Sequence, residues 1–174
     1  NDPDNSVVQL PVTLVVPEFQ QGINAGGGAQ TSSTGNQYAA DQAYRAGQFG
    51  YLGTNSQTRS TRAAIGGTVD DPLYQDLRGK MAGYRFDLAN GTYRVDLQFA
   101  EIQLGKAGER RFDVNIEGDW VLTGFDIYAA AGGRNVALDR SFVVTVTDGH
   151  LDIGFVPQKG SRQAIVNAIL VTQL

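Results

Sequence analysis

Alternation of apolar and polar residues, bounded by short turn signals, constrains the fold of this chain more than any other feature. Every second residue is apolar in "GTYRVDLQF" (91–99), and segments 112–116, 142–146 and 151–155 repeat this pattern. A period of two residues is typical of a strand that buries one face. No segment has the apolar spacing of a helix of three turns. The sequence therefore predicts an all-β protein folded as an antiparallel β-sandwich.

Turn signals between these segments predict that neighbouring strands pair as hairpins. Asn-Gly and Gly-Asp pairs favour the positive φ angles of tight hairpin turns. The last segment, "AIVNAILVTQL" (164–174), has apolar residues on both faces, which is typical of a central strand covered on both sides. Hairpins are expected over residues 84–99 with a turn at Asn90-Gly91, over 110–127 with a turn at Gly118-Asp119, and over 142–155 with a turn at Asp148-Gly149.

The region between residues 26 and 77 is rich in Gly, Ser, Thr, Asn and Gln and has little apolar periodicity. It is therefore expected to form loops, and its aromatic residues argue against disorder. Three consecutive glycines open this region in "INAGGGAQ" (23–30), where a phosphate-binding loop would need a following lysine or helix. The sequence shows neither, so phosphate binding at these glycines is disfavoured. Ile23–Ala25 is expected to form the first strand. The glycines are then expected to form a turn with positive φ or a close backbone approach.

Composition disfavours several kinds of partner. The 174 residues suit one domain, the net charge is -4, the pI is about 4.9 and there is no cysteine. An acidic balance disfavours nucleic acid and anionic membranes, and no apolar run approaches the ~20 residues that span a bilayer. Residues 1–19, with Pro11 and Pro17, are expected to be a linker or an edge strand from a preceding domain, and residues 20–174 the domain itself. The start lacks signal-peptide features, so a mature segment or an excised module is expected.

Residues suited to catalysis are few. The one histidine, His150, follows a predicted turn and is expected to be solvated, and no G-x-S-x-G motif is present. Asp113 and Glu117 on one strand face, like Asp70 and Asp71 in a loop, are expected to be surface carboxylates, so we expect no enzymatic activity. Loop Asp and Asn residues suit Ca²⁺, but no D-x-D-x-D-G run is present. We expect no cofactor, with a structural Ca²⁺ as the open alternative.

Seven motifs follow one another along the chain: "INAGGG" (23–28), "GNQYAADQAY" (35–44), "GTVDDPLYQDLR" (67–78), "GYRFDLANGTYRVDLQFAEI" (83–102), "GERRFDVNIEG" (108–118), "FDI" (125–127) and "NAILV" (167–171). Together they resemble the malectin domain, a family also known as carbohydrate-binding module family 57. The resemblance implies a jelly-roll-like β-sandwich of the galactose-binding type, without catalytic activity, that binds sugar at loops on one end. Family members occur as an endoplasmic-reticulum lectin for glucosylated N-glycans, as plant receptor ectodomains and as modules of bacterial glycan-degrading enzymes. The bacterial module is expected here.

The ligand positions of this family match the sequence only in part. The resemblance assigns Tyr51 to the first ligand tyrosine of the lectin and places Tyr38 where many members have tryptophan. The residues at the other ligand positions are Gly79, Gln103, Leu104, Arg162 and Gln163. The resemblance thus implies the same binding end of the sandwich, without the glucose-disaccharide specificity of the lectin.

The chemistry of sugar recognition points to the same loops. A pyranose presents an apolar CH face to an aromatic ring and hydroxyls to planar polar groups. The long polar region offers both kinds of side chain, although its aromatic residues also suit a second interpretation, in which they pin the loop onto the sandwich. The expected carbohydrate-binding residues are Tyr51 and Gln103 first, then Tyr38, Tyr44, Phe49, Asn55 and Arg162.

Two further residues are expected to be structural: Trp120 to pack in the core or at an edge, and Arg78 to tie its loop through Asp70, Asp71 or Asp76. The sequence therefore favours a non-catalytic module that binds an oligosaccharide or polysaccharide and is covalently linked to a larger secreted or cell-surface glycan-degrading enzyme. The alternative is a spacer or protein-interaction domain that has lost sugar binding, since no aromatic pair follows "FAE".

Overall fold

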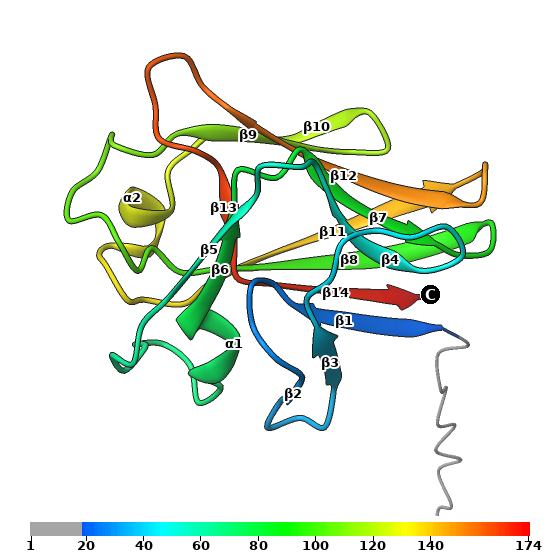
Figure 1. Ribbon diagram of the computed structural model, residues 1–174, viewed down its shortest axis with the longest axis horizontal. Helices are drawn as coiled ribbons and strands as arrows, with labels where there is room; N and C mark the ends of the chain where they lie inside the picture. The colour runs from blue at the N-terminus through cyan, green and yellow to red at the C-terminus, as the bar shows by residue number, and fades with distance from the viewer. Residues whose placement is uncertain (1–18) are drawn as a thin grey trace, which may run out of the picture.

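The computed structural model describes residues 19–174 as a sandwich of two main β-sheets, with a small third sheet at one end (Figure 1). Residues 1–18, expected to be a linker or an edge strand, lie outside the described residues. In spatial order, the first sheet contains β11 (Leu138–Val146), β8 (Gly91–Phe99), β14 (Ala168–Gln173), β1 (Gln20–Asn24), β3 (Gln37–Ala40) and β2 (Gln30–Thr31). The second contains β10 (Asp119–Phe125), β9 (Phe112–Ile116), β12 (His150–Pro157), β7 (Gly83–Asp87) and β4 (Phe49–Leu52). The third contains β13 (Ile165–Val166), β6 (Asp76–Gly79) and β5 (Gln57–Ser60), and the helices are α1 (Pro72–Gln75) and α2 (Ile127–Ala131).

The hydrophobic core lies between the two main sheets, and the predicted all-β sandwich is confirmed. β14 lies between β8 and β1 and is buried on both faces from Ala168 to Val171, so its prediction as a central strand is also confirmed. Burial of apolar surface is the main favourable contribution to folding, and these central strands supply much of it. The alternate residues of β8 that are fully buried are Tyr93, Val95, Leu97 and Phe99.

One of the three predicted hairpins is confirmed. β9 and β10 pair as antiparallel neighbours, and the chain reverses at Glu117 and Gly118, whose φ angles are 53° and 86°. Two positive φ angles are the requirement of the tight turn that matches the twist of a hairpin. The turn therefore begins one residue earlier than the sequence predicts.

The hairpins expected over 84–99 and 142–155 are wrong. β7 pairs with β4 and β12 in the second sheet, whereas β8 pairs with β11 and β14 in the first. Each reversal carries the chain from one sheet to the other, since a turn signal specifies a change of direction and not a hydrogen-bonding partner. Asn90 joins the two crossovers: its amide nitrogen donates to the Thr147 carbonyl and its amide oxygen accepts from the Gly149 N–H, both at 2.9 Å.

The loop expected between residues 26 and 77 is wrong in part, because β2, β3, β4, β5, α1 and the start of β6 lie within it. All four residues of β5 are exposed, and β2 has only two residues. Short edge strands of this kind need no apolar alternation, which is why the sequence pattern does not reveal them. β3 also pairs in parallel with β1, an exception to the antiparallel arrangement.

The glycine turn forms where the sequence predicts it, directly after β1. Gly26 has a φ angle of 82°, and its N–H donates to an Asp41 carboxylate oxygen at 2.5 Å. A Cβ atom on Gly26 would lie 2.3 Å from the Leu77 carbonyl oxygen. Gly28 differs, since no atom lies within 4 Å of the corresponding position and its φ is not positive. The first glycine is therefore required by the fold, and the third is not.

Replacing Gly26 by alanine should lower the free energy of unfolding by about 2–4 kcal/mol, because the left-handed backbone and the contact with the Leu77 carbonyl both resist a Cβ atom. Gly28→Ala, the matched control, should change it by no more than about 0.5 kcal/mol. Urea unfolding followed by tryptophan fluorescence measures both. Equal effects of the two substitutions would contradict this account of the turn.

Candidate functional site

A cavity of about 490 Å³ lies at the end of the sandwich, beside the third sheet. β5 and β6 form one side, and the loops 100–111 and 158–164 form the other, at the left of Figure 1. Its size falls within the range of about 300–1,000 Å³ that is typical of ligand sites. Three apolar and three amide side chains line it: Leu77, Leu104 and Ile165, with Gln57, Gln103 and Gln163.

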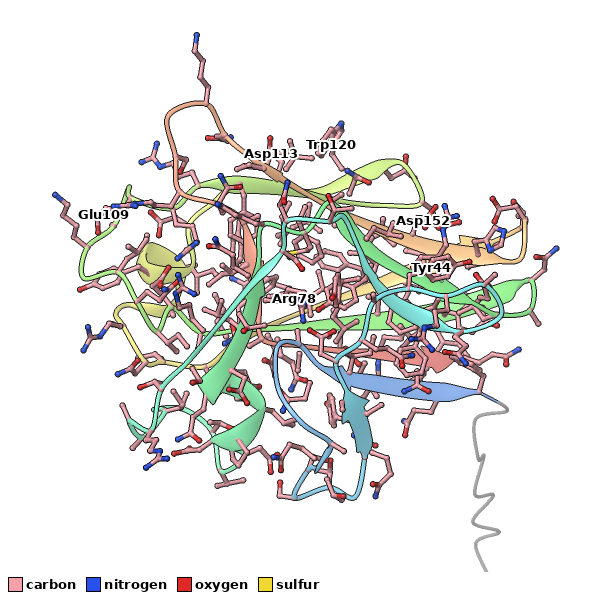
Figure 2. All side chains as sticks on the ribbon, viewed as in Figure 1. Tyr44, Arg78, Glu109, Asp113, Trp120 and Asp152 are labelled. Atoms are coloured by element: carbon pink, nitrogen blue, oxygen red, sulfur yellow. The ribbon has the colours of Figure 1, made fainter. Side chains whose placement is uncertain are left out.

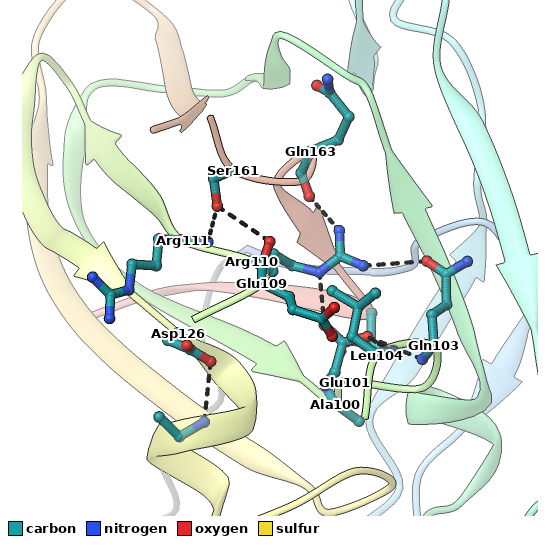
Figure 3. A network of polar contacts seen from close by, with 12 residues as sticks. Ala100, Glu101, Gln103, Leu104, Glu109, Arg110, Arg111, Asp126, Ser161 and Gln163 are labelled. Carbon is teal, nitrogen blue, oxygen red and sulfur yellow. Dashed lines mark hydrogen bonds and ion pairs between the residues drawn. The ribbon is translucent and has the colours of Figure 1, made fainter. Parts of the chain in front are cut away.

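A buried ion pair positions the loops around this cavity. Glu101 is fully buried and accepts a hydrogen bond from Arg110 Nε at 2.7 Å through its second carboxylate oxygen. Its first oxygen accepts from the backbone N–H groups of Gln103 and Leu104, at 3.0 and 3.1 Å. The remaining Arg110 nitrogens donate to the Gln163 carbonyl and, at 3.3 Å, to the side-chain oxygen of Gln103 (Figure 3). Both charges are thus satisfied, as burial requires.

This network joins two loops that are distant in sequence. Arg110 belongs to the loop 100–111, and Gln163 belongs to the loop 158–164. A second set of contacts supports the junction: the backbone N–H of Arg111 donates to Ser161 Oγ, and that of Arg162 donates to the Glu109 carbonyl. The backbone positions of the cavity wall are therefore determined by side chains beneath it.

Glu101 and Arg110, which hold the loops around the candidate site, are not among the residues that the sequence analysis selects. Both stand in motifs that carry the family resemblance, "FAEI" and "GERRFD". The signal in the sequence is Glu101 itself, a carboxylate two residues after β8, whose last three residues are buried, and a buried carboxylate needs a partner. The sequence does not identify Arg110 as the partner of Glu101, because the tertiary structure brings the two side chains together.

A second buried cluster lies next to the cavity, around Arg78 of β6. Its guanidinium forms an ion pair with Asp41, donates to Ser56 Oγ at 2.7 Å and lies 3.6 Å from the centre of the Tyr51 ring. Tyr84 donates to the same Asp41 carboxylate at 3.2 Å. Figure 2 shows Arg78 in the interior of the molecule. The expected tie from Arg78 to Asp70, Asp71 or Asp76 is therefore wrong, since Asp41 is its carboxylate partner.

Two of the expected carbohydrate-binding residues, Gln103 and Arg162, line the end cavity. So do the residues at the other ligand positions that the family resemblance implies, namely Gly79, Leu104 and Gln163. The structure thus brings together five positions that come from three separate segments of the chain. None of the described residues that line the cavity is aromatic.

Tyr51 and Asn55 lie close to this cavity in the chain but do not line it. Tyr51 is half-buried against Arg78, whose neighbours Leu77 and Gly79 are cavity residues. Asn55 is exposed in the loop 53–56.

The other expected residues lie elsewhere in the molecule. Tyr38 is buried in β3, and burial together with the charge of Asp139 raises its pKa to about 12. Tyr44 donates to both oxygens of Asp87 at 3.0 Å. Phe49 stacks on Phe86 with ring centres 6.1 Å apart. These contacts match the interpretation in which aromatic residues pin the long region onto the sandwich.

Tyr38 lines a separate cavity of about 330 Å³ on the outer face of the first sheet. Its charged lining is mostly acidic, with Asp70, Asp96 and Asp139 against the single cation Arg94. Burial raises the pKa of Asp139, which accepts a 2.7 Å hydrogen bond from the Tyr74 hydroxyl. The end cavity is lined instead by Arg59, Lys80, Arg110 and Arg162, so the two cavities differ in the sign of the charge that they present.

The residues considered for catalysis have structural contacts. Asp113 accepts from the Gly124 N–H at 2.6 Å, and Glu117 accepts from the Asp152 N–H at 2.7 Å. His150 is the first residue of β12, and its Nδ1 lies 2.9 Å from Asp87, so it is only partly solvated. Between residues 19 and 174, no group of three or more His, Asp or Glu side chains is arranged to hold a metal ion.

Trp120 is 58% exposed on the outer edge strand β10, and Figure 2 shows its side chain at the periphery of the molecule. It therefore does not pack in the core. Neither helix in the described part of the chain is long and apolar enough to cross a membrane.

The fold defines the class: a jelly-roll-like β-sandwich domain, which the family match below identifies as one of the carbohydrate-binding type. The chain belongs to the malectin domain family, whose model matches residues 19–170.

Similar proteins are much longer than this chain. A probable LRR receptor-like serine/threonine-protein kinase of Arabidopsis thaliana is 30% identical over 161 residues, which are 80% of this chain and 15% of the kinase. Beta-agarase A of Zobellia galactanivorans is 32% identical over 139 residues, 79% of this chain and 23% of the agarase. A Bacteroides uniformis beta-glucuronidase has a TM-score of 0.81 at 28% identity, over 90% of this chain and 18% of that one. The ANX2 ectodomain from Arabidopsis thaliana shares the fold, with a TM-score of 0.72 at 18% identity, over 87% of this chain and 48% of that one.

Replacing Glu101 by glutamine should lower the free energy of unfolding by about 3–5 kcal/mol, because Arg110 is left as a buried charge without a counter-charge. The matched control is Asp152→Asn, which breaks a pair with Arg85 in which the aspartate side chain is 42% exposed. That change should cost no more than about 1 kcal/mol. Chemical unfolding of both variants decides the point, and a Glu101→Gln variant as stable as the control would refute the role assigned to the pair.

Proposed function

We propose that this domain is a non-catalytic carbohydrate-binding module that binds an oligosaccharide or a segment of a polysaccharide in the end cavity. The observation that supports this proposal is the convergence of Gly79, Gln103, Leu104, Arg162 and Gln163 on one cavity of ligand size. Amide side chains there suit sugar hydroxyls, and the apolar side chains suit the CH groups of a ring. The rigid Glu101–Arg110 network below would keep these groups in place before the ligand arrives, which reduces the entropic cost of binding.

The domain would act as part of a larger secreted or cell-surface protein and hold that protein on a glycan. The chain spans about 15% of its Arabidopsis relative and 23% of the agarase, as expected for a module. One relative is named for action on agar and one structural neighbour for action on a glucuronide. Because the relatives also include plant receptor kinases, the bacterial origin expected from the sequence stays a prediction.

A second candidate function, a spacer or protein-interaction domain without sugar binding, has one observation in its favour. Trp120 and Val156 are 58% and 43% exposed on β10 and β12 of the second sheet. Exposed tryptophan is enriched where proteins dock. This surface belongs to the second sheet and not to the residues that line the end cavity, so the two functions can be tested separately.

Binding of a panel of neutral and acidic oligosaccharides, measured by titration calorimetry, tests the proposal. Gln103→Ala should weaken binding of the preferred glycan about tenfold, since one hydrogen-bonding group of the cavity is lost. Gln48→Ala is the matched control, because Gln48 is an exposed glutamine that lines the separate cavity beside Phe49. Absence of binding to every glycan at millimolar concentration would support the spacer function instead. Loss of binding in the Gln48→Ala variant alone would place the site elsewhere.

A further inference from the structure

The end cavity is lined by cations in a protein that is acidic overall. Arg59, Lys80, Arg110 and Arg162 line it, and no Asp or Glu among the described residues does so. The whole chain has 18 acidic and 14 basic side chains, for a net charge of -4. Three of the acidic side chains lie in residues 1–18, so residues 19–174 hold 15 acidic and 14 basic side chains, and chance placement would bring both signs to the cavity. The positive lining is therefore a feature that needs an explanation.

Three of these cations have no counter-charge. The fourth cation, Arg110, is neutralised by the buried Glu101, with 2.7 Å between Arg110 Nε and Glu101 Oε2. Arg59, Lys80 and Arg162 form none of the ion pairs present in residues 19–174. Within residues 19–174, the guanidinium of Arg59 donates to the backbone carbonyl of its neighbour Thr58, at 2.8 Å. Unpaired cations around one cavity focus a positive potential there and attract an anion.

The backbone at Lys80 supports the same conclusion. Lys80 follows β6 with a φ angle of 57°, in the left-handed region where glycine is favoured. Local conformation therefore does not explain a lysine at this position. A requirement for its ammonium group at the cavity does explain it.

The remaining side chains show what kind of anion fits. An aromatic ring would add stacking against the CH face of a neutral pyranose, and none of the described residues that line this cavity is aromatic. Guanidinium groups bind carboxylate or sulfate oxygens through paired, charge-assisted hydrogen bonds, which supply the attraction that a ring would otherwise provide. The amides of Gln57, Gln103 and Gln163 remain for hydroxyl groups. The lining thus combines groups for an anion with groups for a sugar.

Building on the carbohydrate-binding function proposed above, we infer that the ligand of the end cavity is an acidic glycan, with a carboxylate or sulfate group held by Arg162, Lys80 and Arg59. Carboxylate and sulfate are two sources of the same anionic chemistry. One set of titrations separates these sources. It compares oligomers of a uronic acid with their carboxyl-reduced forms, and sulfated galactan oligosaccharides with their desulfated forms. Acidic forms should bind at least tenfold more tightly than their neutral counterparts, and raising NaCl from about 0.05 to 0.5 M should weaken their binding about tenfold.

Two charge-removing variants locate the contact. Arg162→Ala and Lys80→Gly should each weaken binding of the acidic glycan about tenfold and leave binding of a neutral one unchanged. Lys80→Gly places glycine where the backbone favours it, so unfolding does not account for a loss of binding. Lys159→Ala is the control, since it removes the same charge from the loop of Arg162 without touching the cavity lining. It should change affinity less than twofold.

The outcomes separate this inference from the proposed function. Equal binding of neutral and acidic glycans, weakened by Gln103→Ala, would overturn the acidic ligand and retain the carbohydrate-binding module. Binding of no glycan would overturn both. Binding of a polyglutamate peptide as tight as that of the acidic glycan would also overturn the inference, because the cavity would then recognise charge without sugar. Selective binding of the acidic glycan that Arg162→Ala weakens about tenfold would support it.

Discussion

The buried ion pair between Glu101 and Arg110 is the interaction on which the functional end of this domain depends. A carboxylate removed from water is stable only with its charge and hydrogen bonds satisfied, and Arg110 and the N–H groups of Gln103 and Leu104 provide both. The same guanidinium reaches the Gln163 carbonyl. The two loops that together form one side of the cavity are thereby held to one buried charge.

The charges of the site are divided between two layers. Below the surface, the pairs Glu101–Arg110 and Asp41–Arg78 are neutral overall and hold the backbone. At the surface, Arg59, Lys80 and Arg162 have no ion-pair partner within residues 19–174 and are available to a ligand. Because the buried pairs fix the geometry, the surface cations need not be ordered by partners of their own. This division explains how a domain of net negative charge presents a positive cavity.

Local patterns predicted which residues are buried much better than which strands are neighbours. The alternation in β8 marks its inward face correctly, yet the turn after Asn90 joins two sheets instead of two strands of a hairpin. For the site, Gln103 and Arg162 were predicted from the family resemblance. Arg59 and Lys80 were not, because they stand on β5 and just after β6, within a polar region without periodicity. Their proximity to the other residues is a consequence of tertiary structure alone.

The central claim is that the ligand lies over the Glu101–Arg110 network at the end of the sandwich. Backbone amide chemical shifts, followed by NMR during titration with a uronic acid oligosaccharide, test it most directly. The account predicts the largest shift changes at the N–H groups of Gln103, Leu104 and Gln163, two of which bond to Glu101. Changes confined to the residues around Tyr38 or Phe49, with none at the end cavity, would contradict it.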